Sequence, residues 1–443
     1  MSRVRIVGAG LAGAEAAWQA SRLGVDVELW EMKPEKRTPA HRADGMAELV
    51  CSNSLRSDDI NNAVGLLKAE MRILGSLIME AADASRVPAG TALAVDREKF
   101  SAYVTEKIES LPNVTVVRRE MTEVPDDGIV TVIATGPLTS EPLAESIRSV
   151  LGIGNLHFFD AAAPIVDGAS VDLDRTYFYS RYGKGEATDY LNCPFTKDEY
   201  DAFYDALVTA RTAELHGDDG DLTVFEGCMP VEVMAARGRD TLRFGPMKPV
   251  GLPDPKTGRE PYAAVQLRRE NVEGTMYNLV GFQTHLAFPE QKRVFSMIPG
   301  LENAEFLRYG VMHKNTYINS PGTLSRTYSL IKRPEIYFAG QMTGVEGYVE
   351  SAASGLYAGI NAARRALGID ELIIPATTMT GAMGQFVAVG GLSSDFQPMN
   401  ANFGIIEPLG YRVKGGKKAR NEEYARRATE AIAEVKKMIG EMK

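Results

Sequence analysis

Alternating apolar and polar segments at the start of the chain predict the first elements of an α/β domain. A short apolar run ends in a glycine-rich turn and is followed by a stretch of small residues with helical character. A second apolar run covers residues 25–29, and Glu31 stands just beyond it. Short apolar runs bounded by turns are typical of buried parallel strands, which a helix connects. Residues 1–35 are therefore predicted to form the β-α-β start of a doubly wound unit.

The same patterning continues through the first third of the chain. Apolar residues recur at helical spacing at Leu67, Met71, Leu74 and Ile78, which predicts one helix over residues 64–84. Further apolar runs predict strands at 114–117 and 131–133, the second ending in a glycine turn. Few periodic apolar positions occur between residues 36 and 64. A loop of this length beside a nucleotide fold is usually functional.

The character of the sequence changes after about residue 165. Tyrosines become frequent, a charged helix is predicted over 197–215, and short apolar runs alternate with Pro/Gly turns. Strand-like patterning of the first kind resumes near residue 316, and an amphipathic helix is predicted over 420–442. We therefore predict a Rossmann-like α/β domain in two parts, 1–165 and 316–443, with an inserted mixed α/β domain at 166–315.

The first glycine stretch has the spacing of a dinucleotide-binding turn, GxGxxG. Gly8 permits the tight turn, Gly10 lets the backbone approach a pyrophosphate, and Gly13 lets helix and strand pack closely. The acid at Glu31 is placed to accept hydrogen bonds from ribose hydroxyls, and it disfavours a bound 2′-phosphate. The turn as a whole is the predicted cofactor site, formed by Gly8, Ala9, Gly10, Leu11, Ala12 and Gly13 together with Glu31.

A second glycine stretch, near the other end of the chain, extends the predicted cofactor site. It begins at the apolar run 336–339 and continues into another small-residue helix. A cofactor held from both ends of a chain is typical of FAD-binding proteins related in fold to glutathione reductase, and it favours redox chemistry. The residues predicted to contact FAD here are Gly340, Gln341, Gly347 and Tyr348, with Gly136 from the turn after residue 133.

Composition narrows the class of protein further. The net charge of −9 argues mildly against a nucleic-acid partner, although local basic groups occur. The chain has three cysteines, an odd number without disulfide or metal-ligand spacing, so we expect free thiols, no metal and a reducing, cytoplasmic location. No apolar run has the length of a membrane span, and no targeting segment is evident.

Two cysteines and two other side chains have positions that suit chemistry. Cys51 lies in the irregular stretch after the first β-α-β unit, and Cys228 lies between a glycine and a turn. Free cysteines are more often buried small apolar residues than nucleophiles, and Cys193 is expected to be inert. His285 is placed to stack on a planar ligand or to move a proton, and Tyr348 to cover a flavin. The alternative for both is a structural role.

Several segments together resemble the folate- and FAD-dependent tRNA (uracil-5-)-methyltransferase family of bacteria. They are the glycine turn 8–13, Val-Cys-Ser-Asn-Ser-Leu at 50–55, 87–90 with 94–97, Glu-Gly-Cys-Met-Pro at 226–230, and 340–348. The two cysteine segments make the resemblance specific, and it covers nearly the whole chain.

The resemblance implies a reaction and roles for several residues. It implies 5-methyluridine formation at T-loop position 54 of tRNA, with 5,10-methylenetetrahydrofolate as one-carbon donor and NAD(P)H reducing the flavin. Cys228 matches the uracil nucleophile and Cys51 the second cysteine, a base or auxiliary thiol. His285 is then expected to stack on the folate pterin. Basic residues early in the C-terminal segment are expected to contact the T-arm: Arg412, Lys414, Lys417 and Lys418.

Three other interpretations stay open at this point. An NAD(P)H-dependent flavin oxidoreductase acting on a small substrate explains the glycine motifs but neither cysteine segment. An RNA-binding protein with a structural FAD is a second possibility. The third is the longer relative that modifies the wobble uridine of tRNA with a GTPase partner, although no obligate protein partner is evident here. Because only one clear GxGxxG occurs, the nicotinamide is expected to visit the flavin transiently.

Overall fold

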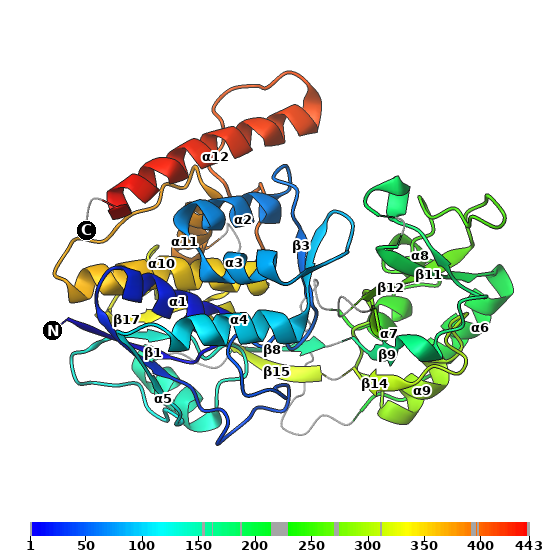
Figure 1. Cartoon of the computed structure of the whole chain (residues 1–443), viewed down its shortest axis with the longest axis horizontal. Coiled ribbons are helices and arrows are strands. Elements are labelled where there is room, and N and C mark those ends of the chain that lie inside the picture. Colours follow the sequence, from blue (N-terminus) through cyan, green and yellow to red (C-terminus); the bar gives the residue numbers. More distant parts are fainter. Residues whose placement is uncertain are drawn as a thin grey trace.

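The fold has two lobes joined by a two-stranded connection (Figure 1). The computed structural model describes residues 2–152, 156–161, 163–186, 188–213, 229–269, 274–310, 312–390, 396 and 398–440, with the backbone alone at 156–161 and 312–316. The first lobe contains elements from both ends of the sequence, and the second contains the middle of the chain. Strand β8 (Leu156–Ala161) pairs antiparallel with β15 (Met312–Tyr317) between the lobes.

A six-stranded sheet forms the centre of the first lobe. Its order is β16-β17-β7-β1-β2-β6, and every neighbouring pair is parallel except β16 with β17. Strand β7 is buried along its whole length and β1 at every position after Arg3, as expected for a sheet that helices cover. The strands are β1 (Arg3–Val7), β2 (Asp26–Trp30), β6 (Val114–Val117), β7 (Val130–Ile133), β16 (Ser329–Leu330) and β17 (Arg333–Phe338).

Two helices from opposite ends of the chain pack against each other on this sheet. They are α1 (Leu11–Arg22) and α10 (Tyr348–Ala366). A Cβ atom at Gly355 would lie 2.1 Å from the Ala12 carbonyl oxygen, and one at Gly359 would lie 2.6 Å from the Ala16 Cα. Only glycine permits this approach, since real Cβ atoms do not come so close to backbone. The contact holds together the two glycine stretches at which α1 and α10 begin.

The remaining first-lobe elements surround this pair. The helices are α2 (Ala63–Leu74), α3 (Leu77–Ala84), α4 (Arg97–Glu109), α5 (Glu141–Leu151), α11 (Met379–Val389) and α12 (Gly416–Gly440), and α12 lies across α2 (Figure 1). A small sheet has the order β3-β5-β4, from β3 (Ser54–Ser57), β4 (Arg86–Val87) and β5 (Ala92–Val95).

The single helix predicted over 64–84 was wrong, because the segment forms two helices. Gly75 adopts a left-handed conformation with φ 76°, which ends α2. Ser76 then caps α3 by accepting a hydrogen bond from the Met79 backbone N–H. The buried Glu15 carboxylate on α1 accepts hydrogen bonds from the Ser76 hydroxyl at 2.6 Å and the Ile78 N–H at 2.9 Å. The apolar spacing gives no sign of this cap, because the apolar positions keep helical spacing across the break between the two helices.

The second lobe is built on an antiparallel sheet of order β10-β11-β12-β13-β9-β14. Aromatic rings fill the core beside it, including Phe195, Phe203 and Phe282. The strands are β9 (Ile165–Asp167), β10 (Tyr177–Phe178), β11 (Tyr190–Phe195), β12 (Ala263–Arg269), β13 (Met276–Leu279) and β14 (Phe306–Arg308), and the helices are α6 (Lys197–Val208), α7 (Val231–Ala236), α8 (Thr241–Phe244) and α9 (Phe288–Phe295).

The predicted fold class is confirmed: a doubly wound α/β lobe in two parts, with a mixed α/β lobe between them. Two helix bounds differ from the prediction, since α6 ends at Val208 and α12 begins at Gly416. The domain boundaries 1–165, 166–315 and 316–443 stay a prediction. Within the described ranges, no helix combines the length and apolar character that a membrane crossing requires.

Candidate cofactor pocket and thiol loop

The first glycine turn has a backbone that other residues do not tolerate. Gly8 has φ 96°, and a Cβ atom there would lie 2.7 Å from the Ala134 carbonyl oxygen. A Cβ atom at Gly13 would lie 1.7 Å from the Gly8 carbonyl oxygen. The turn and the first turn of α1 are therefore pressed against each other and against the end of β7, as the spacing predicts for these two glycines.

Gly10 differs from its neighbours because it faces open space. It is the N-cap of α1, and a Cβ atom there would meet no heavy atom within 4 Å. No side chain caps this end of α1. The first N–H groups of a helix and its positive dipole end make a site for an anion such as a pyrophosphate. The absence of a side chain at Gly10 leaves room for that group, so the turn fits a dinucleotide.

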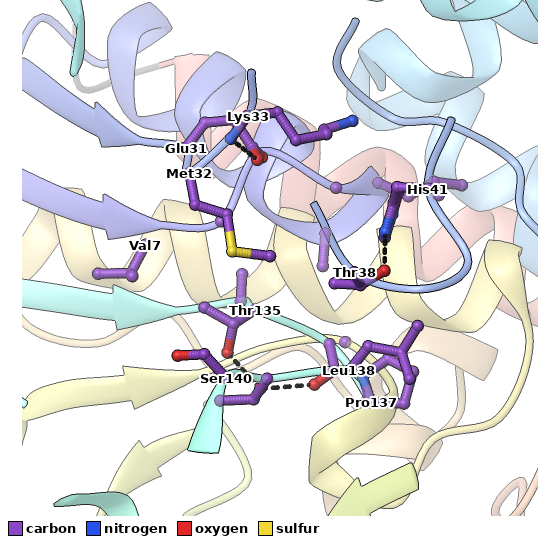
Figure 2. A pocket seen from close by; sticks show the side chains of 18 of the residues that line it. Val7, Glu31, Met32, Lys33, Thr38, His41, Thr135, Pro137, Leu138 and Ser140 are labelled. Carbon is purple, nitrogen blue, oxygen red and sulfur yellow. Dashed lines mark hydrogen bonds between the residues drawn. The ribbon is translucent and has the colours of Figure 1, made fainter. Parts of the chain in front are cut away.

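A cavity of ≈ 170 Å³ opens beside this turn. Figure 2 shows Glu31, Met32 and Lys33 on one side of it, with Thr38 and His41 next to them, and Thr135, Pro137, Leu138 and Ser140 on the opposite side. Residues of the second glycine stretch also line the cavity, and they come from the start of α10 and from the turn that precedes this helix. Those residues are Gly340, Gln341, Tyr348 and Ser351.

Glu31 ties the glycine turn to the end of β2. One carboxylate oxygen accepts a hydrogen bond from the Ala9 N–H at 2.9 Å, and the other accepts one from the Lys33 N–H at 3.0 Å. The side chain is only 7% exposed and lines the cavity. A carboxylate oxygen has more than one lone pair, so each retains capacity for a ribose hydroxyl.

Sequence reasoning missed a polar group at the rim of the cavity. The Thr38 hydroxyl lies 2.6 Å from His41 Nδ1, and Lys33 Nζ donates to the Gly45 carbonyl at 2.6 Å. Burial foremost, and then the charge of Lys33, lower the pKa of His41, so the ring is neutral at pH 7. Thr38 and His41 belong to the long aperiodic stretch 36–64. The length of this stretch indicated a functional loop, but it did not identify individual residues.

Nine of the twelve predicted cofactor residues line the cavity: Gly8, Gly10, Leu11, Ala12, Glu31, Gly136, Gly340, Gln341 and Tyr348. Ala9, Gly13 and Gly347 are not among the lining residues. Gly347 is the N-cap of α10 with φ 115°, and Ala9 donates its N–H to Glu31. The assignment of all twelve residues as cofactor contacts stays a prediction.

Cys51 lies in a loop, residues 49–53, that we call the thiol loop. The side chain of Cys51 is half-buried. The Tyr348 hydroxyl oxygen accepts hydrogen bonds from the Cys51 N–H at 2.6 Å and the Ser52 N–H at 3.3 Å. Burial, followed by the nearby Cys51, raises the pKa of Tyr348 above its ordinary value, so the phenol stays protonated. Tyr348 thus links the thiol loop to the cavity, a connection that the sequence did not indicate.

The second predicted cysteine, Cys228, lies outside the described residues. His285 is buried in the second lobe, where its backbone N–H donates to Glu232 Oε1 at 2.7 Å and burial lowers its pKa. The Val231 N–H donates to the Gln283 carbonyl at 2.8 Å, so the His285 segment runs beside the segment that follows residue 228. Cys193 is fully buried on β11, and burial raises its pKa, in agreement with its expected inertness.

The predicted tRNA contacts lie at and just before the start of α12, away from the cavity lining. All four side chains are exposed, and one is within 4 Å of a carboxylate: Lys418 Nζ lies 3.9 Å from Glu422. The four residues are Arg412, Lys414, Lys417 and Lys418. Among the described residues, the group therefore presents mostly uncompensated positive charge.

Comparison with known proteins identifies the family. The sequence profile of the glucose inhibited division protein A family matches residues 3–370. A methylenetetrahydrofolate–tRNA-(uracil-5-)-methyltransferase TrmFO of Lactobacillus johnsonii is 59% identical, over 99% of this chain and 100% of that protein. Proteins of the same name from Acetivibrio thermocellus and Bacillus licheniformis are 58% and 57% identical, over 97% and 98% of this chain and 98% and 99% of theirs. The chain therefore belongs to the glucose inhibited division protein A family.

Solved structures agree on the fold. GidA of Aquifex aeolicus, in two crystal forms, superposes with TM-scores of 0.71 and 0.72 at 18% identity. The superpositions cover 99% of this chain and 75% and 76% of those chains. At this identity the likeness concerns the fold alone, and it supports the two-part α/β lobe with its insertion. The resemblance inferred from the cysteine segments is confirmed by the full-length relatives.

The open space at Gly10 predicts a substitution that separates folding from cofactor binding. Gly10→Ala is expected to lower the stability of the cofactor-free protein by at most about 1 kcal/mol, the effect of alanine at an N-cap. Its methyl group enters the pyrophosphate position, so the affinity for FAD should fall by more than about ten-fold. Thermal unfolding of the cofactor-free protein and FAD titration measure the two effects.

A matched control for this substitution is Gly440→Ala, at a second glycine with no atom within 4 Å of its Cβ position and remote from the cavity. Stability and FAD affinity of the control should both equal those of the wild type. Unchanged FAD affinity in Gly10→Ala would show that no pyrophosphate lies at this turn.

Proposed function

We propose that this chain is a folate- and FAD-dependent tRNA methyltransferase that forms 5-methyluridine at T-loop position 54. The observation that carries the proposal is its 56–59% identity, over nearly full length, to proteins named methylenetetrahydrofolate–tRNA-(uracil-5-)-methyltransferase TrmFO. The donor is 5,10-methylenetetrahydrofolate, and NAD(P)H is the reductant. Because this reaction needs tRNA and free thiols, we place it in the cytoplasm.

The cavity beside the glycine turn fits FAD. The N-terminus of α1 at Gly10 would hold the pyrophosphate, Glu31 the adenosine ribose, and the start of α10 the opposite end of the cofactor. When bound, the flavin accepts a hydride from NAD(P)H and supplies it for completion of the methyl group. Tyr348, at the first residue of α10, lies on the cavity and contacts the thiol loop, which supports a position for Cys51 beside the cofactor.

The two cysteines divide the work on the uracil ring in this proposal. The Cys228 thiolate adds to carbon 6 and makes carbon 5 a nucleophile, which attacks the methylene of the folate. Cys51 takes the proton from carbon 5, and the bond between the methylene and the folate nitrogen breaks, so that tetrahydrofolate leaves and an exocyclic methylene remains on carbon 5. Reduction of the resulting methylene and loss of the Cys228 sulfur then release 5-methyluridine. His285 contacts the pterin of the folate, and its lowered pKa keeps it a neutral ring suited to stacking.

Product analysis tests the activity directly. Purified protein given unmodified tRNA, methylenetetrahydrofolate and NADH or NADPH should form 5-methyluridine in the T-loop, detected by mass spectrometry after digestion. A parallel sample without folate should form none. If NAD(P)H reduces the flavin but no 5-methyluridine forms, the activity belongs instead to a small-substrate oxidoreductase or a wobble-uridine enzyme.

Serine variants test the division of labour between the cysteines. Cys228→Ser should abolish the covalent tRNA adduct, because a serine hydroxyl is not ionised near neutral pH and cannot add to carbon 6. Cys51→Ser should still trap the adduct while losing product formation. Denaturing gels with labelled tRNA measure the adduct. The reverse pattern, in which only Cys228→Ser retains it, would exchange the two roles.

The basic group at the start of α12 is proposed to contact tRNA phosphates. Alanine replacements at Arg412, Lys414, Lys417 and Lys418 should each weaken tRNA binding and lower the slope of log affinity against log salt by about 1. The measurement is a binding titration at several salt concentrations. Arg426→Ala is a control on the same helix, because Arg426 is paired with Glu423 and Glu430. Unchanged binding in all four variants would place the tRNA elsewhere.

A further inference from the structure

The thiol loop is held by residues from both lobes. From the first lobe, Arg97 donates to the Leu49 carbonyl at 2.7 Å and the Cys51 carbonyl at 3.3 Å, and Tyr348 accepts from the Cys51 N–H. From the second lobe, Arg308 at the end of β14 donates to the Val50 carbonyl. The backbone on both sides of Cys51 is therefore fixed by groups that are distant from it in sequence.

Asn53 is the point where the two lobes meet at this loop. It is fully buried, and its side-chain amide donates to the Val95 carbonyl of β5 at 3.1 Å and the Arg269 carbonyl of β12 at 2.8 Å. Its own carbonyl accepts the Val95 N–H at 3.0 Å. One side chain thus joins the small first-lobe sheet to the large second-lobe sheet, two residues after Cys51.

Arg268 completes this junction with a two-point contact. It lies on β12 and is only 6% exposed. Its Nε donates to Asn53 Oδ1 at 3.0 Å, and its Nη2 donates to the Ser52 hydroxyl oxygen at 2.7 Å. β12 pairs with β11 and β13 on either side, so Arg268 projects from a paired strand within the sheet. Two parallel donors on a planar group fix direction as well as distance.

We propose that Arg268 is a positioning residue for Cys51, acting through Ser52 and Asn53. The docked second lobe then sets where the Cys51 thiol lies relative to Tyr348 and the cavity. The mechanism above uses Arg268 for no chemical step, and Cys51 must meet a substrate whose other partner groups lie in the second lobe. A rigid junction between the lobes holds Cys51 and the second-lobe groups at a fixed separation. The consequence for turnover rests on the proposed function, whereas the consequence for thiol exposure does not.

The test is Arg268→Lys, which keeps the charge but cannot make the two-point contact. Cys51 should be alkylated by iodoacetamide about ten-fold faster, because the two-point hydrogen-bonded contact that holds the thiol loop in place is lost. Turnover to 5-methyluridine should fall about ten-fold through kcat, with the KM for tRNA and the rate of flavin reduction by NAD(P)H unchanged. Peptide mass spectrometry reports each cysteine separately.

Two internal comparisons make the result specific. Cys193 is fully buried on β11, beside β12, and must stay protected from iodoacetamide if the sheet stays folded. Arg181→Lys is the matched control, since Arg181 is a partly buried second-lobe arginine that donates to the Val250 and Lys248 carbonyls and to Gln266. This control should leave Cys51 alkylation and turnover at wild-type values. Ser52→Ala, which removes the Nη2 acceptor together with the acceptor of the Ser54 N–H but keeps the Arg268–Asn53 bond, should give an intermediate rate of Cys51 alkylation.

Three results would overturn the proposal. Wild-type alkylation of Cys51 in Arg268→Lys would show that the contact does not hold the loop. Parallel labelling of Cys193 would show that the substitution opens the sheet as a whole. A rise in the KM for tRNA at constant kcat would assign Arg268 to substrate binding. If the wild-type protein forms no 5-methyluridine, the proposed function fails, and the alkylation rates still decide whether Arg268 positions Cys51.

Discussion

The contact between α1 and α10 is the constraint on which the rest of the structure depends. Gly355 and Gly359 bring the α10 backbone against Ala12 and Ala16, closer than any side chain permits. Both helices begin at glycine turns, so the contact fixes two helix N-termini beside one cavity. Helix termini carry unsatisfied N–H groups and partial positive charge, and two of them form a natural site for an anionic dinucleotide.

The thiol loop depends in turn on that arrangement. Tyr348 is the first residue of α10, and its hydroxyl accepts the Cys51 N–H. The position of α10 therefore determines one side of the loop, and the second lobe determines the other through Asn53. The thiol loop therefore lies between the cavity of the first lobe and the large sheet of the second lobe. The fold achieves this with hydrogen bonds to the loop backbone and to the side chains of Ser52 and Asn53.

Local sequence was sufficient for the elements whose stability comes from local rules. The strands predicted at 114–117 and 131–133 are short apolar runs, and they formed as β6 and β7 where the pattern predicts. The glycine turn was predicted because left-handed φ angles and close backbone contacts leave no other residue at Gly8 and Gly13. Prediction failed over 64–84, where Gly75 ends one helix and Ser76, bound to the distant Glu15, begins another without interrupting the apolar period.

The sequence by itself determined the fold class, the family and nine residues that line the cavity, because each follows from an apolar pattern, a turn or a specific motif. Only the tertiary structure decided that Thr38 and His41 flank the cavity, that Tyr348 holds the Cys51 N–H, and that Arg268 reaches Ser52 and Asn53. These contacts join residues more than 200 positions apart, or lie in a loop without period. Such pairs leave no local pattern, since their energy comes from groups that meet only after the sheets have formed.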